Sequence, residues 1–255
     1  MNIFQSVVLG IIEGVTEFLP ISSTGHLILT AHLLKLVQTN FLKSFEVAIQ
    51  LGAILSIVFL YWKTLLLNKE VIKRIIIAFI PTAVIGILFY KIFKEVLLEK
   101  SIVLWALFLG GIFIIVFERL YKEKNNSVEE IQNMSFSQAF LIGVFQSIAI
   151  IPGVSRAAAT IIGGLILGLR RKAIVEFSFL LAVPTMLAAT VFDLAKNIND
   201  FSFQQLDFLA VGFITSFFVA LISVKFLLRF IKKHSFVSFG IYRIILALLF
   251  WLIIL

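Results

Sequence analysis

Long, uninterrupted apolar runs dominate the chain and decide what it can fold into. A helix needs about 20 apolar residues to cross a lipid bilayer. Six runs have roughly this length, at 44–62, 75–90, 101–118, 173–192, 208–228 and 236–255. Because the apolar residues do not alternate with polar ones, membrane-spanning strands are not expected. At 61% hydrophobic residues and a mean hydropathy of +1.10, residues 1–255 are predicted to form a single all-α polytopic membrane domain.

Two further apolar runs, 3–34 and 136–169, are interrupted near their middle by proline, glycine and polar residues. Each is too long for one span and too short for two spans with a turn. We predict that each forms a re-entrant hairpin, in which two half-helices meet at a tip inside the membrane. Irregular backbone at that depth is tolerated only where it is buried in protein or faces a wet cavity.

The two halves of the chain match each other at a nearly constant spacing. The matched pairs, 132 or 133 positions apart, are Gly10/Gly143, Glu13/Gln146, Pro20/Pro152, Ser23/Ser155, Phe45/Phe177 and Thr82/Thr215. This spacing predicts two repeats, about 1–122 and 134–255, joined by a cytoplasmic linker at about 119–135. Each repeat holds one hairpin and three spans. Because three is odd, the repeats would be inverted, and such folds bind their ligands near the midplane.

Loop charges predict the orientation. Thirteen basic residues lie in loops assigned to the cytoplasm: Lys63, Lys69, Lys73, Arg74, Arg119, Lys122, Lys124, Arg170, Arg171, Lys172, Arg229, Lys232 and Lys233. Six lie in loops on the other side: Lys35, Lys43, Lys91, Lys94, Lys100 and Lys196. This bias places both termini outside and lets the hairpins enter from opposite sides. The net charge of +8 is thereby explained without nucleic acid as a partner.

The first hairpin carries two carboxylates where an apolar helix is expected. Glu13 and Glu17 are four positions apart, so both lie on one helix face. Ionisable groups within a membrane segment cost about 3 kcal/mol or more each, which marks them as functional. Adjacent carboxylates in an apolar site must share a proton, bind a divalent cation or pair with a base.

Hydroxyl groups and a histidine follow these carboxylates. Ser22, Ser23 and Thr24 stand where the second half-helix begins and are candidates for its N-cap. Ser23 and His26 are three positions apart, so the hydroxyl and the imidazole are neighbours. These residue types supply a nucleophile and an acid or base.

The second hairpin supplies groups that bind anions. Gly153 allows close approach of the backbone, Ser155 and Arg156 open the next half-helix, and Thr160 returns a hydroxyl to the same face. Two half-helix N-termini would therefore converge, each with free N–H groups and a partial positive charge. Arg156 adds a bidentate donor for phosphate. The candidate phosphate-binding residues are Ser22, Thr24, Gly153, Ser155, Arg156 and Thr160. The membrane setting points to a phosphate carried on a lipid.

Two segments carry a resemblance to a known family. Glu13–His26 (EGVTEFLPISSTGH) and Pro152–Thr160 (PGVSRAAAT) closely resemble the two signatures of the bacterial undecaprenyl-diphosphatases, the bacitracin-resistance membrane phosphatases. The resemblance extends over the whole chain. It implies removal of the terminal phosphate from undecaprenyl diphosphate in the bacterial inner membrane, at a site open to the periplasmic face. This reaction recycles the carrier lipid for peptidoglycan synthesis and confers bacitracin resistance.

The resemblance also implies a set of functional residues and a cofactor. The implied residues are Glu13, Glu17, Ser23, His26, Ser155, Arg156 and Thr160. The implied cofactor is a divalent metal, Mg²⁺ or Ca²⁺, with Glu13 and Glu17 as its candidate ligands. The expected partners are the lipid substrate and membrane lipid, with a homodimer as a further option. This chain has Ala157 and Ala158 where the family commonly has Ser-Gly, so we expect tuned rather than lost activity.

Several roles stay open at this level. The nucleophile could be His26, Ser23 or an activated water molecule, and Ser23 could serve only as an N-cap. His26 could be a packing residue and Arg156 a counter-ion to a glutamate. An inverted-repeat scaffold is also typical of transporters, so a polyprenyl-phosphate flippase is the alternative function. The type-2 phosphatidic-acid phosphatases are set aside because Ile162 occupies the place of their histidine.

Overall fold

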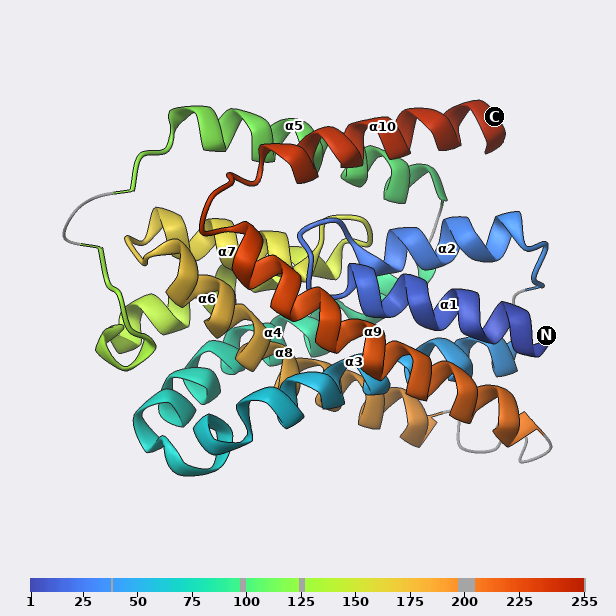
Figure 1. Cartoon of the computed structure of the whole chain (residues 1–255), viewed down its shortest axis with the longest axis horizontal. Coiled ribbons are helices and arrows are strands. Elements are labelled where there is room, and N and C mark those ends of the chain that lie inside the picture. The colour runs from blue at the N-terminus through green and yellow to red at the C-terminus, as the bar shows by residue number, and fades with distance from the viewer. Residues whose placement is uncertain (38, 97–99, 124–126, 197–204, 255) are drawn as a thin grey trace.

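The computed structural model describes residues 1–37, 39–96, 100–123, 127–196 and 205–254. Within these ranges the regular elements are helices, and their order follows the predicted segments (Figure 1). They are α1 (Ile3–Thr16), α2 (Ser23–Leu33), α3 (Asn40–Leu67), α4 (Lys69–Val96), α5 (Lys100–Leu120), α6 (Phe136–Ser147), α7 (Arg156–Ile166), α8 (Arg171–Lys196), α9 (Leu206–Phe230) and α10 (Val237–Ile254), with 3₁₀ turns at Ile131–Asn133 and Ile148–Ile150.

Five of the six predicted spans fall within long helices, and the sixth, 236–255, corresponds to α10 except at its two end positions, of which residue 255 lies outside the described residues. Five of these helices, α3, α4, α5, α8 and α9, are long and apolar enough to cross a membrane. The sixth, α10, is shorter, with 18 residues. Proline lies inside two of the spans, Pro81 in α4 and Pro184 in α8. The protein is therefore an all-helical, multi-pass membrane protein.

The two interrupted runs form helical hairpins, as predicted. The first breaks between Thr16 and Ser23, and the second between Ser147 and Arg156. In Figure 1, α1 and α2 lie toward the end of the molecule that holds both termini, and α6 and α7 lie toward the opposite end. Residues from both tips line one pocket, so the tips meet in the interior.

Equivalent contacts close the base of each hairpin. Asn2 and Gln5 form a capping box at the start of α1, and Ser135 and Gln138 form one at the start of α6. The amide of Gln5 then reaches the Leu34 carbonyl at 3.5 Å, and that of Gln138 reaches the carbonyl of residue 167 at 2.9 Å. Each of these residues stands 133 positions from its counterpart. The predicted spacing thus reappears as shared local structure.

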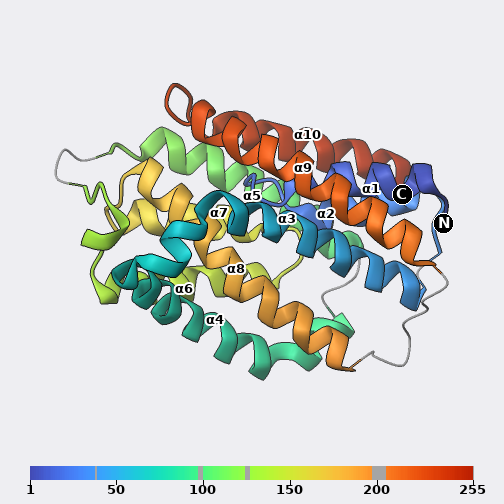
Figure 2. The same cartoon turned by 60° about the horizontal axis from the view of Figure 1, so that its bottom comes forward.

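The helix contacts also correspond between the halves. α1 packs on α9 as α6 packs on α4, while α3 contacts α8 and α5 runs along α10. Figure 2 shows α5 and α10 lying together at one side of the bundle. Glycines permit the closest of these approaches: a Cβ on Gly143 would lie 2.0 Å from the Ala78 carbonyl oxygen, and one on Gly52 would lie 2.4 Å from that of Phe213.

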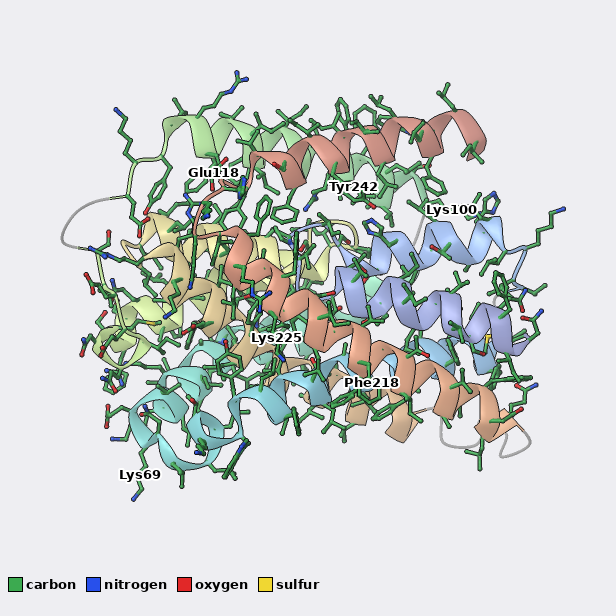
Figure 3. All side chains as sticks on the ribbon, viewed as in Figure 1. Lys69, Lys100, Glu118, Phe218, Lys225 and Tyr242 are labelled. Atoms are coloured by element: carbon green, nitrogen blue, oxygen red, sulfur yellow. The ribbon has the colours of Figure 1, made fainter. Side chains whose placement is uncertain are left out.

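The loops predicted to be cytoplasmic gather at the end of the molecule away from the termini (Figure 1). Ion pairs join them there: Arg171 with Glu118, which Figure 3 labels at this end, and Arg170 with Glu129 at 2.9 Å. Val128 of the linker also pairs with the turn between α7 and α8 through two backbone hydrogen bonds. Part of the predicted linker, 124–126, which includes Lys124, lies outside the described residues.

Replacement of Gly143 tests the contact between α6 and α4. We expect Gly143→Ala to lower the free energy of unfolding by about 1–3 kcal/mol, because the methyl group would overlap the Ala78 carbonyl. The control is Gly86→Ala on α4, where no atom lies within 4 Å of an added Cβ. Alanine there should be neutral or slightly stabilising. Thermal unfolding in detergent measures both, and equal stability of the two variants would contradict the contact.

Candidate active site

A pocket of about 770 Å³ lies where the two hairpin tips meet. Its charged lining residues, Glu17 and Arg156, come from the tips, together with hydroxyl groups such as that of Ser23. α3, α4 and α8 form the remaining wall, which includes apolar side chains such as Ile87 and Met186. The pocket therefore combines a charged region with an apolar region, as a lipid carrying a phosphate group would require.

Both tips enter their second half-helix through the same backbone conformation. Ser22 has a φ of 71° and Ser155 a φ of 79°, in the left-handed region that serine seldom adopts. Each hydroxyl caps its helix, accepting from the Gly25 amide at 3.3 Å and from the Ala158 amide at 3.2 Å. The structural counterpart of Ser155 is therefore Ser22, not Ser23 as the sequence alignment of the halves had paired them.

Caps of this kind leave the first amides of each half-helix free. Among the described residues, the amides of Ser23 and Thr24 in α2 and of Arg156 and Ala157 in α7 make no hydrogen bond. Free N–H groups together with the helix dipole favour an anion at each N-terminus. Ser23, Thr24 and Arg156 line the same pocket, so the two N-termini serve one site.

Glu17, Ser23 and Arg156 form the centre of the site. The Arg156 guanidinium pairs with the Glu17 carboxylate at 3.1 Å, across the two hairpins. The Ser23 hydroxyl donates to the other oxygen of that carboxylate at 2.5 Å. Arg156 Nε is buried and has no hydrogen-bond partner in the described part of the chain. The predicted convergence of the two tips is thus realised as a direct ion pair, and the guanidinium retains a free donor.

Thr160 contacts the backbone of Arg156 and does not line the pocket. Its hydroxyl donates to the Arg156 carbonyl at 2.9 Å and lies 2.6 Å from the Ser178 hydroxyl. The Ser178 carbonyl in turn accepts from Arg156 Nη1 at 2.8 Å. Thr160 is fully buried. Among the predicted phosphate ligands, Ser22, Thr24, Gly153, Ser155 and Arg156 line the pocket, whereas Thr160 supports Arg156.

Glu13 lies one helical turn before Glu17 and is completely buried. Neither of its carboxylate oxygens has a hydrogen-bond partner among the described residues, and the same holds for Oε1 of Glu46 on α3. The charged groups that act on it are Glu17, Glu46 and Arg156. A buried polar group without a partner is costly, so Glu13 is poised to receive a proton, a water molecule or a cation.

His26 is held away from the pocket. Its Nδ1 lies 2.7 Å from the Ser22 carbonyl, and its Nε2 lies 2.7 Å from the Tyr242 hydroxyl. Because a carbonyl only accepts, Nδ1 must carry the proton, and a neutral ring then accepts from Tyr242 at Nε2. The two rings are nearly parallel, 3° apart. Both nitrogens of His26 are therefore engaged, and the ring orders the first turn of α2.

Gln146 occupies the position in α6 that corresponds to Glu13. Its amide donates to Thr82 on α4 at 2.8 Å and to Thr185 on α8 at 3.1 Å. Both threonines line the pocket with it. The Gln146 amide thus links α6 to α4 and α8 at the wall of the pocket.

Sequence reasoning missed three residues that the structure brings to the site. Ser178 lies in an apolar span, and its packing role has no distinctive sequence signal. Tyr242 and Arg243 belong to α10, and Figure 3 shows Tyr242 on the side of that helix nearer the hairpins. An arginine inside an apolar span is itself a signal of function and could have singled out Arg243.

Comparison with known proteins agrees with these features. Residues 6–249 match the family described as "Bacitracin resistance protein BacA". The chain is 54% identical over 251 residues to the undecaprenyl-diphosphatase of Aquifex aeolicus, covering 98% of each protein. It is 52% identical over 255 residues to that of Persephonella marina, covering 100% of each, and 52% identical over 252 residues to that of a Sulfurihydrogenibium species, covering 99% of each.

The family match extends over both hairpins and nearly all of the remaining helices. A sequence identity of 54% over almost the whole chain supports the same assignment. The tip motifs, the ion pair that joins them and the helical membrane fold all lie within the matched residues. On this evidence the chain belongs to the bacitracin resistance protein BacA family.

Proposed function

We propose that the protein is an integral membrane phosphatase that hydrolyses undecaprenyl diphosphate to undecaprenyl phosphate and inorganic phosphate. One observation carries this proposal: Arg156, the free amides of both half-helices and the Ser23–Glu17 pair face a single pocket. The relatives described above are named for this activity. The apolar wall formed by α3, α4 and α8 suits the prenyl chain, and the polar tips suit the diphosphate.

The Ser23 hydroxyl is the best-placed nucleophile. It lines the pocket and donates to Glu17 at 2.5 Å, within reach for proton transfer to that carboxylate. In the proposed reaction Ser23 Oγ attacks the terminal phosphorus, Glu17 takes the hydroxyl proton, and the bond to the bridging oxygen breaks to release undecaprenyl phosphate. Water then attacks the phosphorus, the bond to the serine oxygen breaks as Glu17 returns the proton to that oxygen, and inorganic phosphate leaves. Arg156 and the tip amides stabilise the charge on the transferring group.

The carboxylates also fit a divalent metal. No cluster of three or more acidic or histidine side chains suited to a metal occurs among the described residues. Mg²⁺, however, is commonly held by one or two carboxylates together with substrate phosphates and water. Glu17 and the unpartnered Glu13 could provide such ligands. When bound, Mg²⁺ or Ca²⁺ would neutralise phosphate charge, while Ser23 and Arg156 act on the substrate directly.

The setting of the site follows from the hairpins. We propose that the repeats are inverted, that both termini face the outside of the inner membrane, and that the pocket opens to the periplasmic face. The hairpins approach from opposite ends of the molecule, and the basic loops gather at the end away from the termini, which supports this orientation (Figure 1). Recycling of the carrier lipid for peptidoglycan synthesis, and with it bacitracin resistance, would follow from the activity.

The alternative function is a polyprenyl-phosphate flippase. The approach of two hairpins from opposite ends, with equivalent capping boxes at their bases, favours it. Simple lipid transfer would not require a serine hydroxyl bonded to a buried carboxylate beside a guanidinium. Movement of labelled polyprenyl phosphate in proteoliposomes, with no phosphate released from the diphosphate, would favour the flippase over the phosphatase.

Loss of the cross-hairpin guanidinium should abolish the reaction. We expect Arg156→Ala to reduce phosphate release from undecaprenyl diphosphate by about 1,000-fold or more, because charge stabilisation is usually the largest part of such catalysis. Arg170→Ala is the control, since Arg170 forms a more exposed ion pair with Glu129. Phosphate release by detergent-purified protein measures both. Near-normal turnover by Arg156→Ala would refute the proposed mechanism.

Two variants separate Ser23 from His26. We expect Ser23→Ala to lose at least about 100-fold in kcat, because it removes the nucleophile that faces the pocket. His26→Gln should lose less, because both ring nitrogens are already engaged by Ser22 and Tyr242. A phosphoserine trapped on rapid quenching of wild type would confirm the assignment. Full activity of Ser23→Ala together with an inactive His26→Gln would reverse it.

Removal of metal tests the role of Glu13. We expect a chelator to stop phosphate release and added Mg²⁺ or Ca²⁺ to restore it. In Glu13→Gln the metal concentration that gives half-maximal activity should rise at least about tenfold, because the variant lacks a carboxylate ligand that has no hydrogen-bond partner among the described residues. Glu130→Gln, on the exposed linker, should behave as wild type. An unchanged metal requirement in Glu13→Gln would exclude this residue as a ligand.

A further inference from the structure

Arg243 is a completely buried arginine within the apolar helix α10. No carboxylate lies within ion-pair distance of it among the described residues. A buried charge without a counter-ion is expensive in any protein and more so within a membrane. A buried guanidinium at this position therefore requires hydrogen-bond acceptors for its N–H groups.

The partners are five backbone carbonyls. Nε donates to Leu107 at 3.3 Å, and Nη2 donates to Ala106 at 2.9 Å and to Gly153 at 2.8 Å. Nη1 donates to Val154 at 2.8 Å and to Pro20 at 3.4 Å. Arginine has five N–H donors in a planar fork, so this set satisfies all of them. Lysine, with three donors on a single nitrogen, could not reproduce it.

The carbonyls belong to three separate elements. Pro20 lies in the tip of the first hairpin, Gly153 and Val154 lie in the tip of the second, and Ala106 and Leu107 lie in α5. Gly110 on α5 makes room for this contact, since a Cβ there would lie 2.2 Å from Arg243 Nη2. A single guanidinium therefore joins both tips to the α5–α10 pair.

The orientation of these carbonyls determines which way the tip amides face. In a trans peptide the C=O and the following N–H point in opposite directions. Because the Val154 carbonyl points to Arg243, the Ser155 N–H points away from it. That N–H makes no hydrogen bond in the described part of the chain, and Ser155 lines the pocket. The positive φ of Ser155 and Gly153 belongs to the same backbone turn.

Tyr242 extends this arrangement to the first tip. It precedes Arg243 on α10 and contacts His26, whose Nδ1 holds the Ser22 carbonyl. Consecutive residues of α10 thus contact the first tip at two places, Pro20 and His26. Helix α10 is far from both motifs in sequence, yet its side chains contact both hairpins and fix the position of their tips.

We propose that Arg243 is a positioning residue for phosphoryl transfer. It holds both hairpin tips by their carbonyls, so that the Ser155 amide and the half-helix N-termini face the phosphate, and it does not touch the substrate itself. This inference rests on the proposed phosphatase activity. A purely structural arginine would stabilise the fold without affecting turnover by the protein that remains folded.

Two glycine variants separate these roles. Gly110→Ala displaces the guanidinium but keeps its charge. Gly240→Ala also crowds the α5–α10 contact, with its Cβ 2.7 Å from the Gly111 carbonyl oxygen, yet no guanidinium atom is among the nearest neighbours it would meet. Both should lower thermal stability in detergent. We expect only Gly110→Ala to lower kcat, by about 10- to 100-fold, with KM changed less than about threefold, because misplaced amides weaken binding of the transition state.

Arg243→Lys provides the conservative variant, and we expect it to show the same selective fall in kcat. Equal kcat in wild type, Gly110→Ala and Arg243→Lys would overturn the inference, as would equal losses of kcat in Gly110→Ala and Gly240→Ala. Failure of the proposed function would appear differently, as absence of phosphate release by folded wild type. In that case the measurement is the rise in unfolding temperature that inorganic pyrophosphate produces. We expect this rise in wild type and Gly240→Ala and a smaller rise in Gly110→Ala. Equal rises in all three proteins would overturn the inference.

Discussion

The structure depends on how two broken helices satisfy their backbone polar groups in an apolar environment. A helix that ends within the membrane leaves amides and carbonyls without water to bind. Here the serine caps take the third amide of each second half-helix, Arg243 takes three tip carbonyls, and the first amides remain free toward the pocket. The free amides at the pocket are the groups on which the proposed anion site rests, and α3, α4 and α8 complete the wall around them.

Similar backbones in the two hairpins carry different chemistry. Ser22 and Ser155 adopt the same positive φ, so Ser23 and Arg156 occupy equivalent first positions of their half-helices. One supplies a hydroxyl and the other a guanidinium, and the Glu17 carboxylate contacts both. Similar backbones with different side chains therefore bring a hydroxyl and a guanidinium together on one carboxylate in one pocket.

Much of this arrangement could be predicted from the sequence. The five long apolar helices, the two broken runs and the meeting of Glu17, Ser23 and Arg156 follow from hydropathy, helix-breaking residues and repeat spacing. The orientation of His26 could not be predicted, because its partner Tyr242 is 216 positions away. The role of Arg243 could not be predicted either, because its five carbonyl partners belong to segments far from it in the sequence.

The sequence by itself determined the membrane fold and the chemical groups available, because apolar runs must span a bilayer and buried ionisable groups require a function. Only the tertiary structure decided which of these groups face the pocket. Serine and histidine are neighbours on one helix, yet the hydroxyl lines the pocket while the ring is held against α10. The direction in which a side chain or amide points at a hairpin tip depends on the orientation of the peptide groups and on partners distant in sequence. These partners are in contact only when the two halves have packed together.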